Sequence, residues 1–199
     1  MKSIEDSILT AIKSKPRGTL LFPDDYKKMG SSEGVRQALK RLAEKNEIKR
    51  IAQGIYVRPK QNEFIGEIIP TAEEVAVGIA KRDKIRIIPT GVFALNALGL
   101  STQIPMKLVY LTDGSPREIQ IGKRSIKFKK TTPKALSVKG TKSALVVQVL
   151  REIGKDKVRE DELQKIHDVL KSEDVRNLKH DIQLVPDWIR KIMEKALYE

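Results

Sequence analysis

The sequence predicts an α+β fold with three parts: an N-terminal unit of helices and a β-hairpin, a mixed α+β unit, and a helical C-terminal segment. Apolar residues recur three or four positions apart near both ends of the chain, whereas the middle alternates short β-prone runs with turn residues. The 199 residues include 40% apolar side chains, which is enough for a packed core. We place the three parts at residues 1–60, 62–140 and 141–199.

Charge is distributed unevenly along the chain. Lysine and arginine number 39 against 26 aspartates and glutamates, which gives a formal net charge of +13. Residues 1–60 carry 14 basic and 7 acidic side chains (+7), residues 61–140 carry 13 and 7 (+6), and residues 141–199 carry 12 and 12. A surplus of this size favours a polyanionic partner, most often nucleic acid, over the alternative of a surface that is simply rich in lysine.

The chain has no cysteine and no long apolar run. The lack of cysteine excludes disulfides, thiolate zinc sites and a cysteine nucleophile. No apolar run approaches the roughly 18 residues that a membrane-spanning helix needs. The first segment, "MKSIEDSILTAIKSK", is typical of an amphipathic helix with acidic residues in its first turn rather than of a signal peptide. We therefore expect a cytoplasmic protein.

The N-terminal unit is expected to begin with a helix over residues 3–14, in which isoleucine recurs every four positions at Ile4, Ile8 and Ile12. The breakers in "KPRG" end this helix. The apolar "TLLF" that follows predicts a short strand. The segment "DDYKKMG" then predicts a short helix that ends at Gly30.

A second long helix is expected from Ser31 or Ser32, either of which can cap it, to Asn46. Two β-prone runs, "IKRIA" and "IYVRP", then flank Gln53-Gly54, which is a typical two-residue hairpin turn. Pro59 and "KQNE" are interpreted as a linker. The predicted order of helix, strand, helix, helix and hairpin is that of a winged helix-turn-helix.

The middle part is expected to hold two helices, two strands and a hairpin. Thr71 and Glu74 predict a capping box for the helix "TAEEVAVGIAKR", and a second helix ends at Gly99. The strands are "IRIIP" and "MKLVYLTDG", and "REIQIGKRSIKFKKT" predicts a basic hairpin. Four helical patterns follow in the last part, and Pro186 stands at the start of the last one.

Few residues suggest catalysis, so we expect no enzyme, cofactor or metal. His167 and His180 have no metal-ligand spacing, and "GTKSAL" lacks the full phosphate-loop motif. The alternative is a metal-dependent nuclease in which Asp113 and Glu118 hold Mg²⁺, since two carboxylates bind a hard cation well. Asp113-Gly114 is equally typical of a simple turn.

The helix from Ser32 onward is instead suited to double-stranded DNA, because an α-helix fits the major groove. Arg36 is expected to bind guanine and Gln37 adenine, and the hairpin is expected to contact phosphates or the minor groove. The predicted DNA-binding residues are Ser31, Ser32, Arg36, Gln37, Lys40, Arg41, Lys49, Arg50, Gln53, Arg58 and Lys60. The same architecture also binds RNA or protein in other chains, and an adaptor of that kind stays open.

The segments "GTLLFPDDY" and "GVRQALKRLAEKNEIKRIAQGIYVRPK" resemble the N-terminal winged helix of AbiEi-type antitoxins of bacterial abortive-infection, type IV toxin–antitoxin systems. The segment "IIPTGVFALNALGLSTQIP" is similar to part of the second domain of that family. The resemblance covers about residues 4–130, and the last 60 residues match no family pattern.

This resemblance implies a non-enzymatic antitoxin and autorepressor that binds inverted repeats at its operon promoter. A homodimer on DNA is expected from the two-fold symmetry of inverted repeats. The resemblance also implies a functional partner, a nucleotidyltransferase-like toxin, which the antitoxin counters without a stable complex. The resemblance assigns the DNA contacts of the family to Arg36, Gln37, Lys40, Arg50, Gln53 and Arg58.

Overall fold

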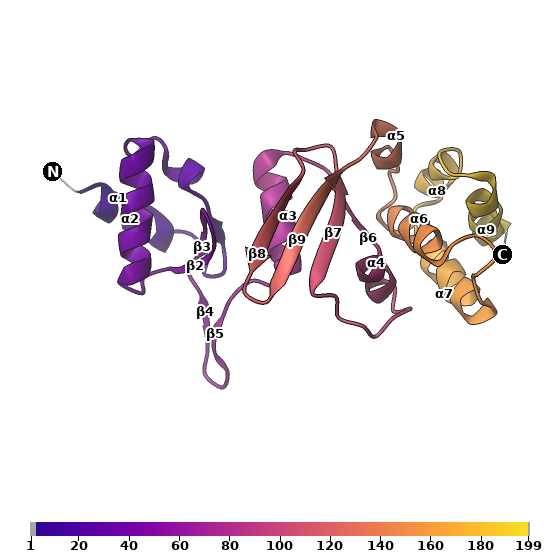
Figure 1. The fold of residues 1–199 in the computed structure, drawn as a ribbon, viewed down its shortest axis with the longest axis horizontal. Helices are drawn as coiled ribbons and strands as arrows, with labels where there is room; N and C mark the ends of the chain where they lie inside the picture. The colour runs from indigo at the N-terminus through magenta and orange to yellow at the C-terminus, as the bar shows by residue number, and fades with distance from the viewer. Residues whose placement is uncertain (1–2, 199) are drawn as a thin grey trace. The chain divides into compact units, whose positions relative to one another are not determined.

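The computed structural model describes residues 3–198, which form two compact units (Figure 1). The first unit runs to Ile79 and includes Gln120–Gly122, and the second comprises Ala80–Ile119 and the residues from Lys123 onward. Within the described residues there are nine α-helices and three small sheets, so the predicted α+β class is confirmed. Residues 1, 2 and 199, which belong to the predicted first and last parts of the chain, lie outside the described residues.

The first unit combines helices with a three-stranded sheet and a separate hairpin. Its elements up to the sheet are α1 (Ile4–Lys13), β1 (Leu20–Leu21), the 3₁₀-helix η1 (Pro23–Tyr26), α2 (Ser32–Glu44), β2 (Lys49–Ala52) and β3 (Ile55–Val57). The hairpin and the last helix are β4 (Lys60–Asn62), β5 (Gly66–Ile68) and α3 (Ala72–Asp83), which crosses the boundary between the units.

Local side-chain contacts explain where these helices begin. Ser3 and Asp6 form a capping box at the start of α1. The Asp25 carboxylate accepts the Phe22 N–H at 3.1 Å and fixes the turn of η1. Helix α2 ends just before Asn46, whose φ of 59° is the left-handed conformation that asparagine tolerates. The two long predicted helices of this unit are therefore confirmed, whereas the short helix predicted to end at Gly30 is a 3₁₀-helix that ends at Tyr26.

The sheet has the order β1-β3-β2, with all strands antiparallel. Leu20 pairs with Val57, and Arg50 pairs with Tyr56. Gly54, with φ 68°, closes the β2–β3 hairpin at the predicted turn. Tyr56 joins the core of this unit, which is formed by Ile8, Ile12, Leu21, Tyr26, Val35, Ala38, Leu39, Leu42, Ile48 and Tyr56.

The prediction of a linker after Pro59 is wrong, because β4 and β5 form a second hairpin there. The Asn62 side-chain oxygen accepts the backbone N–H groups of Phe64 and Ile65 at 2.9 and 3.1 Å. Gly66 then adopts a φ of 75°, which an L side chain rarely takes. Asparagine and glycine thus close a turn in a segment whose polar composition suggested only a connection.

The second unit holds a four-stranded sheet of order β6-β7-β9-β8. Its strands are β6 (Ile87–Thr90), β7 (Lys107–Thr112), β8 (Arg117–Ile121) and β9 (Arg124–Lys130). β7 runs antiparallel to β6 and parallel to β9. The predicted strands and basic hairpin are confirmed, and the capping box of Thr71 and Glu74 precedes them in α3.

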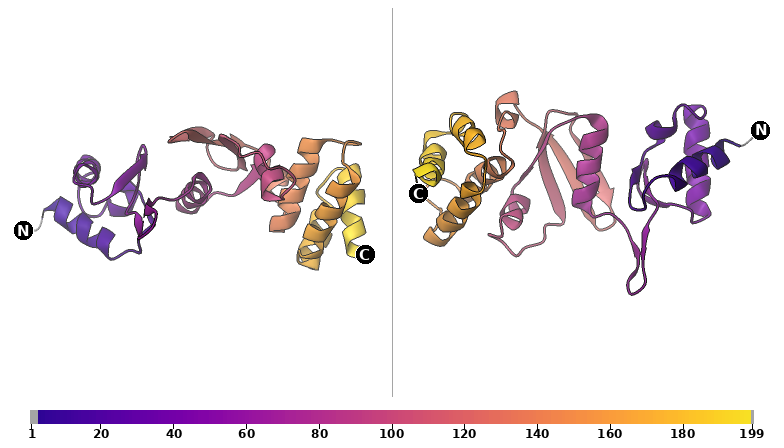
Figure 2. Two further views of the ribbon diagram at one scale, coloured as in Figure 1. Left: turned by 90° about the horizontal axis from the view of Figure 1, so that it is seen from below. Right: turned by 180° about the vertical axis from the view of Figure 1, so that it is seen from behind.

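Helices complete the second unit on one side of this sheet, where α4 and α6 lie beside β6 (Figures 1 and 2). They are α4 (Val92–Ala97), α5 (Pro133–Leu136), α6 (Thr141–Ile153), α7 (Glu160–Lys171), α8 (Val175–Asp181) and α9 (Asp187–Tyr198). Residues of α4 share one apolar core with α6, α7, α8 and α9. No helix within residues 3–198 has the length and apolar character needed to cross a membrane.

The start of α6 is fixed by carboxylates from later in the chain. Asp181, which is fully buried, accepts the N–H groups of Lys139 and Gly140 at 2.8 Å each. Glu173 accepts the N–H groups of Lys142 and Ser143 at 2.8 and 3.3 Å. The amides of Gly140, Lys142 and Ser143 at this helix N-terminus are therefore satisfied from within the protein.

Candidate nucleic-acid interface

Helix α2 has one buried and one exposed face. The buried face packs into the core through Val35, Ala38, Leu39 and Leu42. Arg36, Gln37 and Lys40 are exposed on the other side. Since residues three and four apart are neighbours on a helix, these three predicted DNA-binding positions form one continuous surface.

Packing against α1 holds the first turn of α2. The Ser31 hydroxyl accepts the Gly34 N–H at 3.1 Å and caps the helix, so this hydroxyl already has a role in the fold. Ile4 lies close by, and a Cβ on Gly30 would be only 2.8 Å from its Cδ1 atom. Ser32 remains exposed at the first helical position.

The exposed face of α2 alternates paired and unpaired groups. The Gln37 amide donates to the Glu33 carboxylate at 2.8 Å, and Lys40 lies 3.8 Å from the Glu44 carboxylate. Among the described residues, the Arg36 guanidinium has no hydrogen-bond or ion-pair partner. Arg36 is therefore the group on this face that is readiest to meet an acceptor outside the protein.

A shallow hollow of about 330 Å³ connects α2 to the β2–β3 hairpin. Its rim brings Lys40 of α2 together with Lys49 and Arg50 of β2. The lining residues are Lys40, Ala43, Glu44, Asn46, Ile48, Lys49, Arg50 and Tyr56. We call the surface formed by Arg36, Gln37, Lys40, Lys49 and Arg50 the helix–hairpin face. Its four cations stand against Glu33, Glu44 and Glu67, so a phosphate backbone would still meet a net positive surface.

Lys49 is held by an ion pair with Glu67 of β5. The hydrogen bond from Lys49, together with its charge, holds the pKa of the Glu67 carboxyl below its usual value. Arg50, the next residue along β2, is exposed and has no such partner among residues 3–198. Arg50 is therefore freer than Lys49 to contact a phosphate.

Arg58 lies away from the helix–hairpin face. Its guanidinium donates to the Lys13 carbonyl oxygen at 3.4 Å, close to the end of α1. Gln53 is exposed at the hairpin turn. The predicted hairpin residues thus separate into Lys49, Arg50 and Gln53 on β2 and its turn, and Arg58 beyond β3.

A second basic group surrounds the start of β4. The Lys60 side chain packs over Gly18, where a Cβ would lie 2.6 Å from the Lys60 Cε atom. The Arg17 guanidinium donates to the Pro59 carbonyl oxygen at 3.1 Å. We call Arg17, Arg58 and Lys60 the base cluster. The sequence reading missed Arg17 because "KPRG" was interpreted only as a helix stop.

Arg41 is exposed but lies beside α1. Its guanidinium is 4.0 Å from the Glu5 carboxylate, which also binds Lys45 at 2.5 Å. Glu5 is only 16% exposed. These two cations therefore connect α2 to α1 and stand apart from Arg36 and Lys40.

The two carboxylates of the nuclease alternative do not come together. Glu118 pairs with Lys107, at the first residue of β7, at 2.8 Å. Asp113 follows the last residue of β7 and accepts the Arg86 N–H at 2.9 Å. Along an extended strand these places are about 20 Å apart, too far to share one ion. No group of three or more metal-binding side chains occurs within the described part of the chain.

The two histidines have structural surroundings. His167 is buried, and its Nε2 atom lies 3.1 Å from the Ile192 carbonyl oxygen. His180 contacts the buried Asp181 carboxylate at 2.8 Å. Neither lies beside a nucleophile in these contacts, and the N-terminus of α6 in "GTKSAL" is filled by Glu173.

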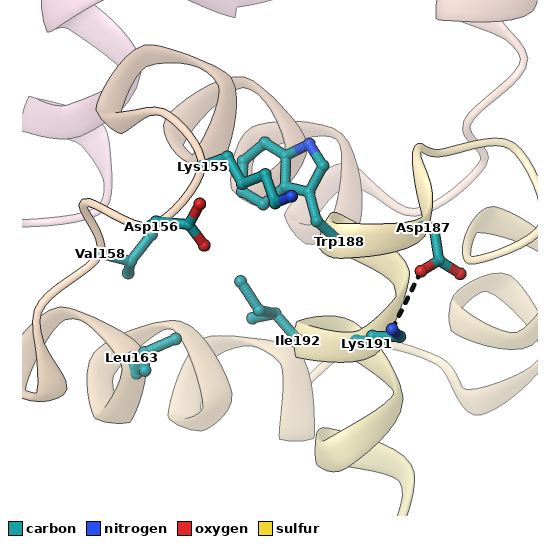
Figure 3. A pocket seen from close by; sticks show the side chains of 8 residues that line it. All are labelled: Lys155, Asp156, Val158, Leu163, Asp187, Trp188, Lys191 and Ile192. Carbon is teal, nitrogen blue, oxygen red and sulfur yellow. Dashed lines mark ion pairs between the residues drawn. The ribbon is translucent and has the colours of Figure 1, made fainter.

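A second hollow, of about 510 Å³, lies in the helical part of the second unit (Figure 3). Trp188 and Ile192 of α9 face Leu163 of α7 across it, and Asp187 binds Lys191 at 3.2 Å on its rim (Figure 3). The remaining lining residues are Lys155, Asp156 and Val158. Two lysines balance two aspartates, so this hollow suits an apolar group better than a polyanion.

A family model described as "Family of unknown function (DUF6088)" matches residues 7–178 of the chain. The match includes all of the helix–hairpin face and the base cluster. No curated protein matches the sequence.

Proposed function

The chain belongs to the DUF6088 family, whose function is unknown, and we propose that it is a sequence-specific DNA-binding protein that represses its own operon. The observation that carries this proposal is the grouping of Arg36, Gln37 and Lys40 on α2 with Lys49 and Arg50 on β2. One helix face for base edges, beside a basic strand for phosphates, is the division of contacts that DNA recognition needs.

In this proposal the first unit acts as a winged helix-turn-helix. The order α1, β1, η1, α2, β2 and β3, with a β1-β3-β2 sheet, supports that reading. α2 enters the major groove, where Arg36 binds guanine and Gln37 binds adenine. Lys40, Lys49 and Arg50 contact the phosphates beside the groove, and Gln53 at the turn reaches the neighbouring backbone or minor groove.

The resemblance to AbiEi-type antitoxins extends the proposal to a non-enzymatic, cytoplasmic antitoxin. Its functional partner is then a nucleotidyltransferase-like toxin encoded in the same operon. The resemblance is carried by residues 18–60 and by the segment "IIPTGVFALNALGLSTQIP". The net positive charge of the first two thirds of the chain supports a DNA partner. Residues 141–199 carry equal numbers of basic and acidic side chains, so they are assigned no DNA contact.

The decisive experiment is a binding titration with duplexes that tile the DNA upstream of the protein's own gene. We expect one segment to bind at least about 1,000-fold more tightly than unrelated DNA, as specific regulators do. Arg36→Ala should lower this preference by about 1–3 kcal/mol, whereas Glu152→Ala, at an exposed residue of α6, should leave it intact.

Equal affinity for every duplex would contradict sequence-specific repression and favour a general nucleic-acid binder. Tighter binding to single-stranded or duplex RNA than to any DNA would favour the adaptor alternative. The antitoxin role is tested separately, by co-expressing the chain with the neighbouring reading frame and measuring growth. Failure to rescue growth, with DNA binding retained, would limit the function to repression.

A further inference from the structure

Within the described residues the β4–β5 hairpin pairs with no other strand and is tied to β2 by the ion pair between Glu67 and Lys49, although it is well formed. Every residue from Gln61 to Ile69 is exposed, and β4 and β5 pair only with each other. An isolated two-stranded hairpin is marginal in water, and its outer edges offer unpaired backbone groups. A well-formed hairpin with no core contact of its own indicates that another surface covers it.

The tip of this hairpin presents large apolar side chains in a fixed geometry. Phe64 is 92% exposed and Ile65 is 73% exposed. The Asn62 side chain holds both of their N–H groups, so the turn is ordered before any partner arrives. Preorganised aromatic and aliphatic groups of this kind are typical anchors of protein interfaces.

Charge is arranged oppositely at the two ends of the hairpin. Glu63 stands at the apolar tip, whereas the base cluster of Arg17, Arg58 and Lys60 surrounds the start of β4. A surface with one acidic and one basic end is complementary to a copy of itself turned through 180°. The same acidic, apolar tip is poorly suited to DNA, because carboxylates repel phosphates.

We propose that the β4–β5 hairpin is a dimerisation arm, in which β4 pairs antiparallel with β4 of a second copy and forms a four-stranded sheet. A two-fold axis at Gln61 places Gln61 opposite its own counterpart, and Lys60 opposite Asn62 of the second copy. Glu63 of each tip then meets the base cluster of the other copy. Phe64 and Ile65 pack beside the base cluster of the other copy and are buried from solvent.

The β4 edge fits this pairing better than the β5 edge. An antiparallel pair of β5 strands centred on Glu67 would set two carboxylates directly opposite each other, which is destabilising. Glu67 is also already engaged by Lys49 of β2. Gln61, its cross-strand neighbour on β4, is uncharged, so two copies of it can stand opposite each other without repulsion.

The absence of cysteine in the sequence allows a direct test by cross-linking in the full-length protein without DNA. In the proposed dimer, Gln61→Cys places two thiols across the axis, where paired strands set Cα atoms about 4.5–5.5 Å apart, within disulfide range. The matched control is Glu67→Cys, at the residue of β5 that pairs with Gln61. In the proposed sheet the two Glu67 positions are three strand spacings apart, or about 14 Å. We expect mild oxidation to link Gln61→Cys into a dimer and to leave Glu67→Cys monomeric on a denaturing gel.

A charge swap tests the second feature of the proposal, with sedimentation velocity as the measurement. Glu63→Lys should raise the dimer dissociation constant by about tenfold or more, because it sets a cation against the base cluster. Adding Lys60→Glu to the same chain should restore most of the affinity. Glu152→Lys changes the net charge equally at an exposed site of α6 and should have no effect.

A monomer at all accessible concentrations would overturn the proposal. So would a dimer that Glu67→Cys links better than Gln61→Cys, or one that Glu63→Lys leaves unchanged. These measurements involve no DNA, so their failure leaves the proposed repressor function untouched, and loss of DNA specificity leaves the dimer untouched.

Discussion

The Gln37 side-chain amide donates a hydrogen bond of 2.8 Å to the Glu33 carboxylate, one turn earlier in α2. The residue proposed to bind adenine is therefore restrained by a negative charge on the same helix face. Any DNA that approaches this face must displace the hydrogen bond and meet the carboxylate. Glu33 thus opposes binding to every sequence while it orders Gln37.

We predict that Glu33→Gln strengthens DNA binding. The substitution removes a like charge from the interface and releases a side-chain pair of about 0.5 kcal/mol, so affinity should rise by about twofold or more. Fluorescence anisotropy with specific and unrelated duplexes measures the change. A loss of affinity in place of this gain would show that Glu33 itself contacts the DNA.

Arg36 and Arg50 should act differently when replaced by alanine. Arg36→Ala should cost about 1–3 kcal/mol on the preferred sequence and relax one base position, because a bidentate contact is lost. Arg50→Ala should weaken all sequences alike and lower the slope of log K against log salt by about 0.9. Titrations at four salt concentrations distinguish the two patterns. Identical behaviour of both variants would contradict the division between base and phosphate contacts.

Arg58→Ala should change folding stability more than DNA affinity. Its guanidinium bonds the Lys13 carbonyl oxygen at the end of α1, and a hydrogen bond from a charged group contributes about 1.5–3 kcal/mol. Since Arg58 is half-buried, we expect a loss near the lower end of that range in urea unfolding. The salt slope of DNA binding should stay unchanged, and a reduced slope would instead assign Arg58 to the phosphate contacts.

The Lys49–Glu67 ion pair predicts a pH-dependent contribution to stability. Because the pKa of Glu67 is lowered in the folded state, the contribution is present above the ordinary pKa of the carboxyl. It is lost as the pH falls through the lowered pKa. Carboxyl carbon NMR should show that the pKa of Glu67 is below the usual value of a glutamate carboxyl. In Lys49→Ala the pKa of Glu67 should return towards its usual value, and no change would mean that Lys49 is not its partner in solution.

Asp181→Ala should destabilise the second unit strongly. The substitution leaves the buried N–H group of Gly140 without an acceptor, at about 1–3 kcal/mol, and also removes the acceptor of the part-buried Lys139 N–H group. Trp188 is the one tryptophan of the sequence and lies in this unit, so its fluorescence in urea reports the loss. Circular dichroism should show the first unit melting as in the unchanged protein.

Elements with local signals were predictable from the sequence. Helix α2 has a capping serine and a buried stripe at helical spacing, and the β2–β3 hairpin has glycine at its turn. The β4–β5 hairpin also has a local cause, the Asn62 carbonyl and Gly66. It was missed because polar residues without a clear strand pattern are equally typical of a linker.

The candidate site was only partly predictable, because its grouping depends on contacts far apart in sequence. Helical periodicity is enough to place Arg36 and Lys40 on one exposed face. It cannot show that Arg58 turns towards Lys13, which is 45 residues earlier in the chain. Nor can it show that Arg41 is held by Glu5 on another helix. Charge identifies the residues that suit a polyanion, whereas tertiary contacts decide which of them remain free.

The carboxylates that complete the start of α6 also set an order for folding during synthesis. The first unit draws its core from residues between Ile8 and Tyr56, so that core can close while most of the chain is still untranslated. The amide of Lys139 must instead wait for Asp181, 42 residues later, which is about 2–8 s at ordinary rates of translation. The basic helix and hairpin are therefore complete on the ribosome before the helical unit behind them can form.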